Sequence, residues 1–235
     1  MFGKDDRGGG GPRPPALEAA AQQSDEDGLA GMATGLVEKL LDAGIDGGGP
    51  FDPAQVVAQR ALATSADPES AVNSIVRRHL AIGATGGFVT GLGGLVTMPI
   101  ALPANVIEFY LTATRMVAAI AQVRGYDVDS PQIRTAVLLT LVGADADDLL
   151  RKAGVVGGFG AGRRLTSLAA QRLPGPALMM VNKAIGFRII GQAGRATVGR
   201  LGKGVPVVGG VIGAGLDGYL LKRIADHAKA EFPQR

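Results

Sequence analysis

The sequence predicts an all-α protein, and three observations carry this prediction. Capping residues and prolines recur just before apolar stretches of helical length, and apolar residues within several of these stretches follow a helical period. No segment shows alternating apolar and polar residues repeated at regular spacing, and β-branched residues cluster only in short pieces such as residues 205–212. We therefore expect residues 28–235 to form one helical domain.

The first 27 residues are predicted to be a disordered tail. They contain four consecutive glycines, three prolines and mixed charge, with too few large apolar side chains to offset the entropy of ordering. A short amphipathic helix follows, and residues 47–50 break it before a second helix begins near Pro53. The apolar face of the first helix consists of Leu29, Met32, Leu36, Val37, Leu40 and Leu41.

Asp67, Pro68 and Glu69 are typical of a helix N-terminus, because they supply a cap, a first-turn proline and an acid near the positive end of the helix dipole. The helix that they open is expected to continue into a glycine-rich segment.

Two prolines, Pro99 and Pro103, are predicted to bracket a turn, with Pro103 opening a long helix that continues through Val123. Gly125 is expected to end that helix, and the pair at residues 130–131 repeats the cap-and-proline pattern for another.

Residues 79–107 carry no formal charge and hold six glycines. Glycines four positions apart form a bare ridge on a helix, against which a second backbone can pack closely. A second ridge lies near the C-terminus, in line with Asp217. The sequence thus predicts a glycine-rich helical hairpin packed on a glycine-rich C-terminal helix, through Gly83, Gly87 and Gly91 on the first ridge and Gly209 and Gly213 on the second.

The uncharged run is long enough to cross a membrane, since a span needs about 20 residues. It is rich in glycine, bears threonine and contains two prolines, and the second ridge offers only residues 204–216 before an acidic residue. We therefore favour a buried hairpin, or one that enters a bilayer from one side, over a transmembrane helix.

The net charge of +3 conceals a strong asymmetry. Residues 1–52 hold 4 basic and 10 acidic side chains, whereas residues 151–235 hold 14 Lys or Arg against three acidic residues. This basic region is expected to favour an anionic membrane surface, with a solvated positive face as an equal alternative. Nucleic acid is not an expected partner, because the chain has no Trp and too few Phe and Tyr for a base-stacking platform.

Several kinds of chemistry are disfavoured. The absence of Cys excludes thiolate nucleophiles and Cys-bound metals, and His79 and His227 do not stand at metal-ligand spacing. Residues 213–218 match Gly-x-Gly-x-x-Gly, but only 17 residues follow, too few for a dinucleotide-binding unit. No signal peptide is recognisable at the N-terminus. We expect an intracellular protein that is not an enzyme and uses no cofactor or metal.

One polar stripe lies on the otherwise apolar helix that follows Pro103. Such a helix is predicted to be buried, so its polar side chains need partners, for which basic and acidic residues on other apolar segments, including Arg195, are candidates. An internal salt-bridge network is the favoured interpretation, and a ligand site is the alternative. The candidate residues are Asn105, Glu108, Arg115, Arg188 and Asp217.

The glycine-rich segment at residues 83–103, the segments at 115–121 and 124–127, and the segment at 203–213 together resemble the bacterial EcsC family. The resemblance covers about residues 70–232, and Asp217 stands where it leads us to expect asparagine. The family is named for a protein encoded beside an ABC transporter, and its members look like hydrophobic helical proteins. The resemblance thus supports the helical fold.

These observations predict a non-enzymatic, membrane-associated helical protein on the cytoplasmic side, peripheral on the inner face of the plasma membrane. Its basic C-terminal third would contact acidic lipid, and its hairpin would insert or contact a membrane protein complex, as in an accessory factor to a transport or secretion system. The alternative is a soluble helical protein that binds a lipid or other apolar ligand, with Glu108 and Arg115 orienting the polar end of that ligand.

Overall fold

The computed structural model describes residues 28, 35, 37–48, 51–92, 94–142, 183, 186 and 206–235, and within these residues the fold is all-α. Residues 37–45 are helical. The labelled helices are α2 (Ala54–Ala63), α3 (Pro68–Leu92), α4 (Gly94–Val123), α5 (Pro131–Val142) and α9 (Pro206–Glu231). The only β-pairing in the described chain is an isolated bridge between Gly48 and Phe51. The predicted tail at residues 1–27 lies outside the described residues.

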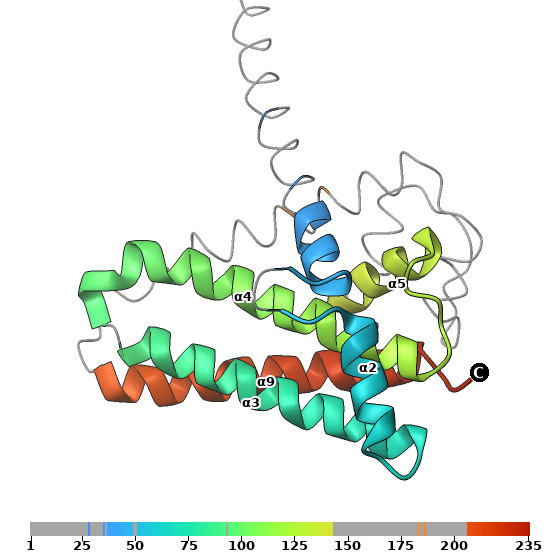
Figure 1. Cartoon of the computed structure of the whole chain (residues 1–235). Helices are drawn as coiled ribbons and strands as arrows, with labels where there is room; N and C mark the ends of the chain where they lie inside the picture. The colour runs from blue at the N-terminus through green and yellow to red at the C-terminus, as the bar shows by residue number, and fades with distance from the viewer. Residues whose placement is uncertain are drawn as a thin grey trace, which may run out of the picture.

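The long helices α3 and α4 form a hairpin joined at residue 93, and α9 lies beside α3 and runs in the opposite direction (Figure 1). Helix α2, the helix at residues 37–45 and α5 gather around the other end of this group. The architecture is thus the predicted glycine-rich hairpin with the C-terminal helix packed against it. We call the end that carries α2, α5 and the helix at residues 37–45 the base.

Local sequence explains where most helices begin and end. The Asp67 carboxylate accepts a hydrogen bond from the Ser70 backbone N–H at 2.9 Å and another from its hydroxyl at 2.6 Å, as an N-cap does. These two bonds lower the pKa of Asp67. At the far end of α4, Gly125 adopts φ 84° and the Tyr126 N–H donates to the Ala121 carbonyl at 3.0 Å. The predicted starts near Pro53 and Pro131 are likewise confirmed.

The predicted turn between Pro99 and Pro103 is wrong, because α4 is helical from Gly94 through both prolines. The chain reverses instead between the end of α3 at Leu92 and the start of α4 at Gly94. A proline removes only its own N–H and crowds the carbonyl four residues earlier, which costs about 3 kcal/mol but leaves a helix free to continue with a bend. Figure 1 shows α4 bending in its first part.

The core lies in the base, around the second half of α4. Residues 110–121 of α4 are all buried, and Met116 and Ile120 have no exposed surface. Leu139 of α5 and Leu221 of α9 are equally enclosed. After α9 ends, Phe232 is fully buried and packs edge-on against the Tyr126 ring, with 5.2 Å between the ring centroids.

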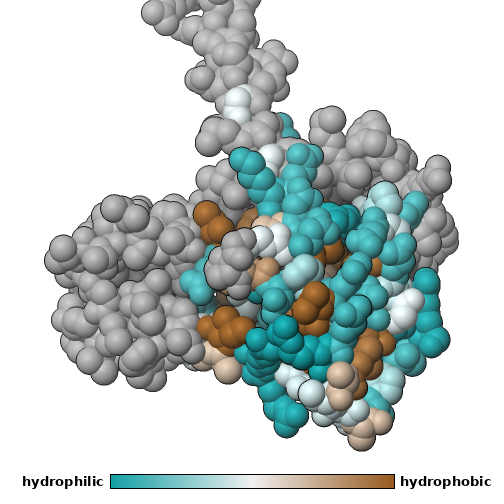
Figure 2. All heavy atoms as spheres, viewed as in Figure 1, coloured by the Kyte–Doolittle hydropathy of each residue, from teal (hydrophilic) through white to brown (hydrophobic). Residues whose placement is uncertain are grey.

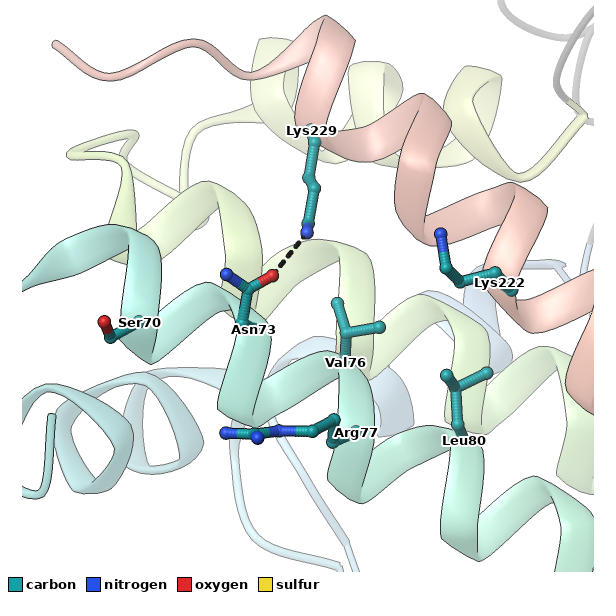
Figure 3. A pocket seen from close by; sticks show the side chains of 7 residues that line it. All are labelled: Ser70, Asn73, Val76, Arg77, Leu80, Lys222 and Lys229. Atoms are coloured by element: carbon teal, nitrogen blue, oxygen red, sulfur yellow. Dashed lines mark hydrogen bonds between the residues drawn. The ribbon is translucent and has the colours of Figure 1, made fainter.

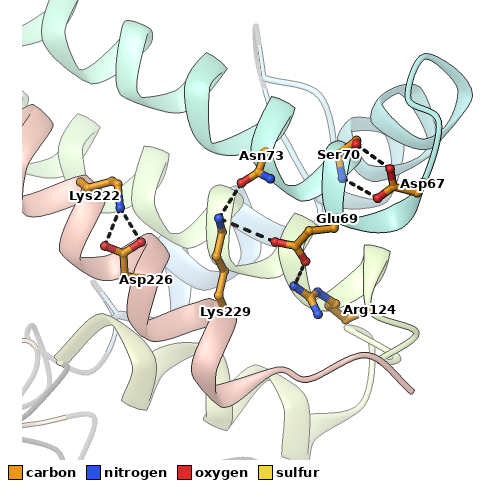
Figure 4. A network of polar contacts seen from close by, with 8 residues as sticks. All are labelled: Asp67, Glu69, Ser70, Asn73, Arg124, Lys222, Asp226 and Lys229. Carbon is orange, nitrogen blue, oxygen red and sulfur yellow. Dashed lines mark hydrogen bonds and ion pairs between the residues drawn. The ribbon is translucent and has the colours of Figure 1, made fainter.

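Ion pairs join the elements of the base. Arg134 of α5 contacts Asp46 at 2.6 Å and Asp42 at 3.0 Å, and these carboxylates raise its pKa. On the other side Glu69 of α3 bonds Arg124, and Lys229 of α9 donates to the Asn73 side chain at 2.7 Å (Figure 4). The base therefore has both an apolar core and a polar frame that ties distant segments together.

Candidate functional site

The uncharged stretches of three helices lie together at the end of the molecule away from the base (Figure 1). They are residues 79–92 of α3, 94–107 of α4 and 206–216 of α9, which we call the tip. At a rise of 1.5 Å per residue the first two are each about 21 Å long and the third is about 16 Å long. The tip thus has a definite length that can be compared with a bilayer.

The register between α3 and α9 is fixed by contacts at two places. A Cβ atom added at Gly83 would collide with the Leu221 side chain, and Asn73 is bonded to Lys229. Residue 82 of α3 therefore lies at about the level of residue 222 of α9. In the hairpin, residues 79 and 107 are equally far from the reversal at residue 93 and share a level.

Large apolar side chains are exposed at the border between tip and base. The exposed fractions are 36% for Ile82, 41% for Ile107, 49% for Leu216 and 59% for Tyr219. We call these four residues the apolar belt. On the face drawn in Figure 2, some hydrophobic residues lie along the edge where the described surface meets the grey atoms, and others lie further from it. One other large apolar side chain in the described part is comparably exposed, namely Leu62 on α2 in the base.

Four exposed cations, which we call the basic collar, lie beside the apolar belt on the side of the base: Arg77, Arg78, Lys222 and Arg223. Lys222 is paired with Asp226 at 2.6 Å, whereas the three arginines make no hydrogen bond or ion pair within the described residues. The acidic side chains described at this level are Asp226, which pairs with Lys222, Glu108, which is exposed, and Asp217, which is half-buried and has interactions of its own. Cations therefore outnumber acids around the border.

A groove of about 530 Å³ runs between α3 and α9 on one side of the collar (Figure 3). Its cations differ in whether they have a side-chain partner. Lys222 bonds Asp226 and Lys229 bonds Asn73, while Arg77 has no such partner in the described chain. The lining residues are Ser70, Asn73, Val76, Arg77, Leu80, Lys222 and Lys229.

Arg115 is the most unusual of the residues singled out from sequence. It is only 6% exposed, and its buried Nε and Nη2 atoms have no hydrogen-bond partner among the described residues. The guanidinium stacks on the Phe51 ring with 4.3 Å to the ring centroid. Burial lowers the pKa of Arg115, while the charge of Asp52 acts in the opposite direction.

His79, the first residue of the tip on α3, is 2% exposed, and its Nδ1 donates to the Ile75 carbonyl at 2.8 Å. Burial lowers the pKa of His79 to about 4, with smaller contributions in the same direction from Arg115 and Arg78. His79 is therefore neutral at pH 7.

The structure describes the remaining candidate residues from the sequence only in part. Glu108 is exposed and makes no ion pair with the buried Arg115 among the described residues. Arg188 and Arg195 lie outside the described residues, as does the side chain of Asn105. The predicted network of these residues with Asp217 stays a prediction.

Of the ridge glycines, Gly83 lies directly against α9, at Leu221. The surroundings of Gly87, Gly91, Gly209 and Gly213 lie outside the description, although their helices are described. Extending the register one residue at a time puts Gly91 at the level of Gly213. Close packing at these positions stays a prediction.

Sequence reasoning missed two features. It did not single out Phe51, which is 64 positions from the arginine that it covers, and it did not predict that the apolar belt would be exposed. Both depend on which helix faces which, and the isolated aromatic at position 51 after a glycine-rich break was the one available signal.

The described residues contain one helical stretch long and apolar enough to cross a membrane, Val106–Val123, and 72% of it is buried inside the protein. That burial is typical of a core helix. No group of three His, Asp or Glu residues that could hold a metal ion occurs in the described part of the chain.

The fold and the border surface define a class of protein: an all-α domain built on a glycine-rich helical hairpin with a C-terminal helix alongside. The chain matches the EcsC protein family over residues 32–235 and belongs to that family. Neither the comparison with curated proteins nor the comparison with solved structures gives a match.

Proposed function

We propose that this protein is a non-enzymatic membrane-associated protein whose tip inserts into one leaflet of an anionic bilayer. The observation that carries the proposal is the apolar belt: Ile82, Ile107, Leu216 and Tyr219 are exposed where the uncharged helices begin. Inserting them removes apolar surface from water, which is worth about 25 cal/mol per Å². A tyrosine at this level fits a membrane interface, where an apolar ring and a polar hydroxyl are both accommodated.

The length of the tip supports entry from one side. The hydrocarbon core of a bilayer is about 30 Å thick, so one leaflet contributes about 15 Å. The uncharged segments of α3 and α4, each about 21 Å long, reach through one leaflet but do not span both. On α9 the uncharged segment of about 16 Å ends at Leu216, and the register places Asp217 at the level of residue 87 of α3. Helix α3 continues to Leu92 and α4 begins at Gly94, so the described backbone on both sides of the reversal is helical, as a membrane interior requires.

The basic collar supports the choice of an anionic surface. Each cation near an acidic bilayer contributes about 1 kcal/mol, and Arg77, Arg78 and Arg223 have no competing partner in the described chain. Acidic lipid is characteristic of the cytoplasmic leaflet, so the proposed location is the inner face of the plasma membrane. An accessory role beside a transport or secretion complex is consistent with this location.

The experiment is flotation of the full chain with vesicles of phosphatidylcholine containing phosphatidylglycerol. The double variant Leu216→Glu, Tyr219→Glu places two charges in the belt at exposed positions and is expected to remain folded but lose vesicle binding. Leu62→Glu is the matched control, because Leu62 is 41% exposed but lies in the base. The proposal fails if the wild type stays in the soluble fraction at low salt, or if both variants float equally well.

A further inference from the structure

The guanidinium of Arg115 is a buried charge that lacks hydrogen-bond partners on one edge among the described residues. A buried guanidinium normally finds a carboxylate or several carbonyl groups, since leaving buried N–H groups unpaired is costly. Here both Nε and Nη2 are without a partner in the part of the chain that the structure describes, although Arg115 is only 6% exposed. The comparison within the same molecule is Arg134, which contacts both Asp42 and Asp46.

The two unpaired atoms are arranged as a recognition edge. Nε and Nη2 donate from the same side of the planar guanidinium, where their two N–H groups point in parallel. This is the edge that binds the two oxygens of a carboxylate or phosphate in a bidentate pair. Their position therefore matches a specific chemical group, an oxyanion with two acceptor oxygens.

The surroundings of the Arg115 guanidinium favour an anionic ligand. Arg78 adds positive potential, and His79 is neutral at pH 7. The nearby carboxylate, Asp52, is engaged by Arg60 at 2.8 Å rather than by Arg115. The site thus has positive charge and free donors in a largely desolvated place.

One aromatic ring covers the guanidinium on the side of the chain segment between the helix at residues 37–45 and α2. Phe51 stacks on Arg115 and is only partly buried, and its backbone is paired with Gly48 by two hydrogen bonds of 3.1 Å. This segment crosses the face of α4 in Figure 1. The ring of Phe51, rather than a helix, therefore covers this face of the guanidinium.

We propose that Arg115 and Phe51 form an anion-binding site whose ligand presents a carboxylate or phosphate group to the Nε and Nη2 edge of Arg115. The same group can arrive on a soluble molecule or on a lipid headgroup. The site is independent of membrane insertion by the tip, because neither residue belongs to the apolar belt or the basic collar.

The test compares melting temperatures of the full chain with sodium phosphate, sodium acetate and, at matched ionic strength, sodium chloride. The wild type is expected to melt at least about 2 °C higher in saturating phosphate or acetate than in chloride. Arg115→Met should remove this gain. In chloride, Arg115→Met should itself raise the melting temperature, because it replaces an unpaired buried charge with an apolar side chain of similar length.

Two matched variants separate an anion site from a structural role. Arg134→Met, at the arginine that has its own carboxylates, should lower the melting temperature and keep the response to phosphate. Asp52→Asn should keep or increase the response, because the negative charge of Asp52 opposes the approach of an anion to Arg115. If Asp52 is instead the true counter-ion, Asp52→Asn will strongly destabilise the wild-type chain, and that result overturns the proposal.

The source of the anion is decided by repeating the comparison with vesicles of phosphatidylcholine containing phosphatidic acid. A response to soluble phosphate or acetate that requires Arg115 assigns a soluble ligand, and one seen only with phosphatidic acid assigns a headgroup. No Arg115-dependent response to any of the three overturns the site. Membrane insertion is scored separately, since Arg115→Met should float with phosphatidylglycerol vesicles as the wild type does.

Discussion

The base and the border of the tip differ in how they pair their charged side chains and bury their apolar ones. In the base, exposed charges are paired across distant segments, as Arg134 is with Asp42 and Asp46, and large apolar groups such as Phe232 are fully enclosed. At the border, Arg77, Arg78 and Arg223 are unpaired within the described chain, and Leu216 and Tyr219 are about half exposed.

This difference indicates that the two regions are adapted to different surroundings. In water, unpaired cations and exposed apolar side chains contribute little to the stability of the fold. Surface charges there are screened, and the apolar groups remain hydrated. Against an anionic bilayer both features become favourable. Among the described residues, the border is thus the surface on which the proposed membrane contact depends, and substitutions on either side of it can locate where the base ends.

The largest expected effect concerns His79, the strongly buried polar group at the first position of the tip on α3. Its pKa is about 4 in the folded chain and 6.5 in the reference state, so the unfolded chain binds a proton that folded His79 excludes. The contribution of His79 to stability is full above pH 6.5 and is lost as the pH falls toward 4, by an amount of the order of 3 kcal/mol. Chemical denaturation at pH 7 and pH 4.5 should show that the free energy of unfolding falls less between these pH values for His79→Leu than for the wild type.

Equal losses in the two proteins would mean that His79 is hydrated in solution. The close packing of the base would then stop before residue 79, and the border would lie nearer to α2.

The next effect tests whether α3 and α9 remain in close contact past the border. Gly83→Leu adds a side chain where a Cβ would already collide with Leu221, so it should lower the free energy of unfolding by about 1 to 3 kcal/mol. Gly218→Ala is the control, because nothing lies within 4 Å of its added Cβ and the gain in helix propensity is up to about 1 kcal/mol. Urea unfolding of both variants measures the two opposite shifts.

If Gly83→Leu is neutral or stabilising, the two helices are separate at this level. The same substitution at Gly87 and Gly209 then extends the measurement into the tip, where leucine at packed positions should again lower the melting temperature.

A smaller effect is expected for single charges of the collar. Arg77→Gln, Arg78→Gln and Arg223→Gln should each weaken partitioning into phosphatidylglycerol vesicles about fivefold, which corresponds to about 1 kcal/mol per charge, and should reduce its salt dependence. Lys39→Gln removes an exposed cation of the base and should leave partitioning unchanged. Similar losses for all four variants would indicate attraction by overall charge, without a preferred orientation.

Much of the fold was predictable because helix ends are encoded locally. The cap at Asp67 and the terminating glycine at position 125 act within a few residues, and both were recognised from the sequence. The turn expected between Pro99 and Pro103 was wrong because a local rule gives the cost of a proline and not the tertiary context that lets a helix continue through it.

The candidate site was less predictable because it depends on contacts between distant segments. The sequence identified Arg115 as a polar residue on an apolar helix, but not that Phe51 would cover it. Ile82 and Leu216 stand in apolar segments, which periodicity alone would assign to a core, and only the arrangement of the helices reveals their exposure.

The most direct test of membrane insertion is the depth at which the border lies. The chain has no Trp, so Tyr219→Trp introduces a single reporter in the belt, and Leu62→Trp introduces one in the base. With vesicles of phosphatidylglycerol carrying brominated acyl chains, the fluorescence of the belt reporter should shift to shorter wavelength and be quenched, while the fluorescence of the base reporter should not change. Equal quenching at both sites, or none at either, would contradict insertion through the tip.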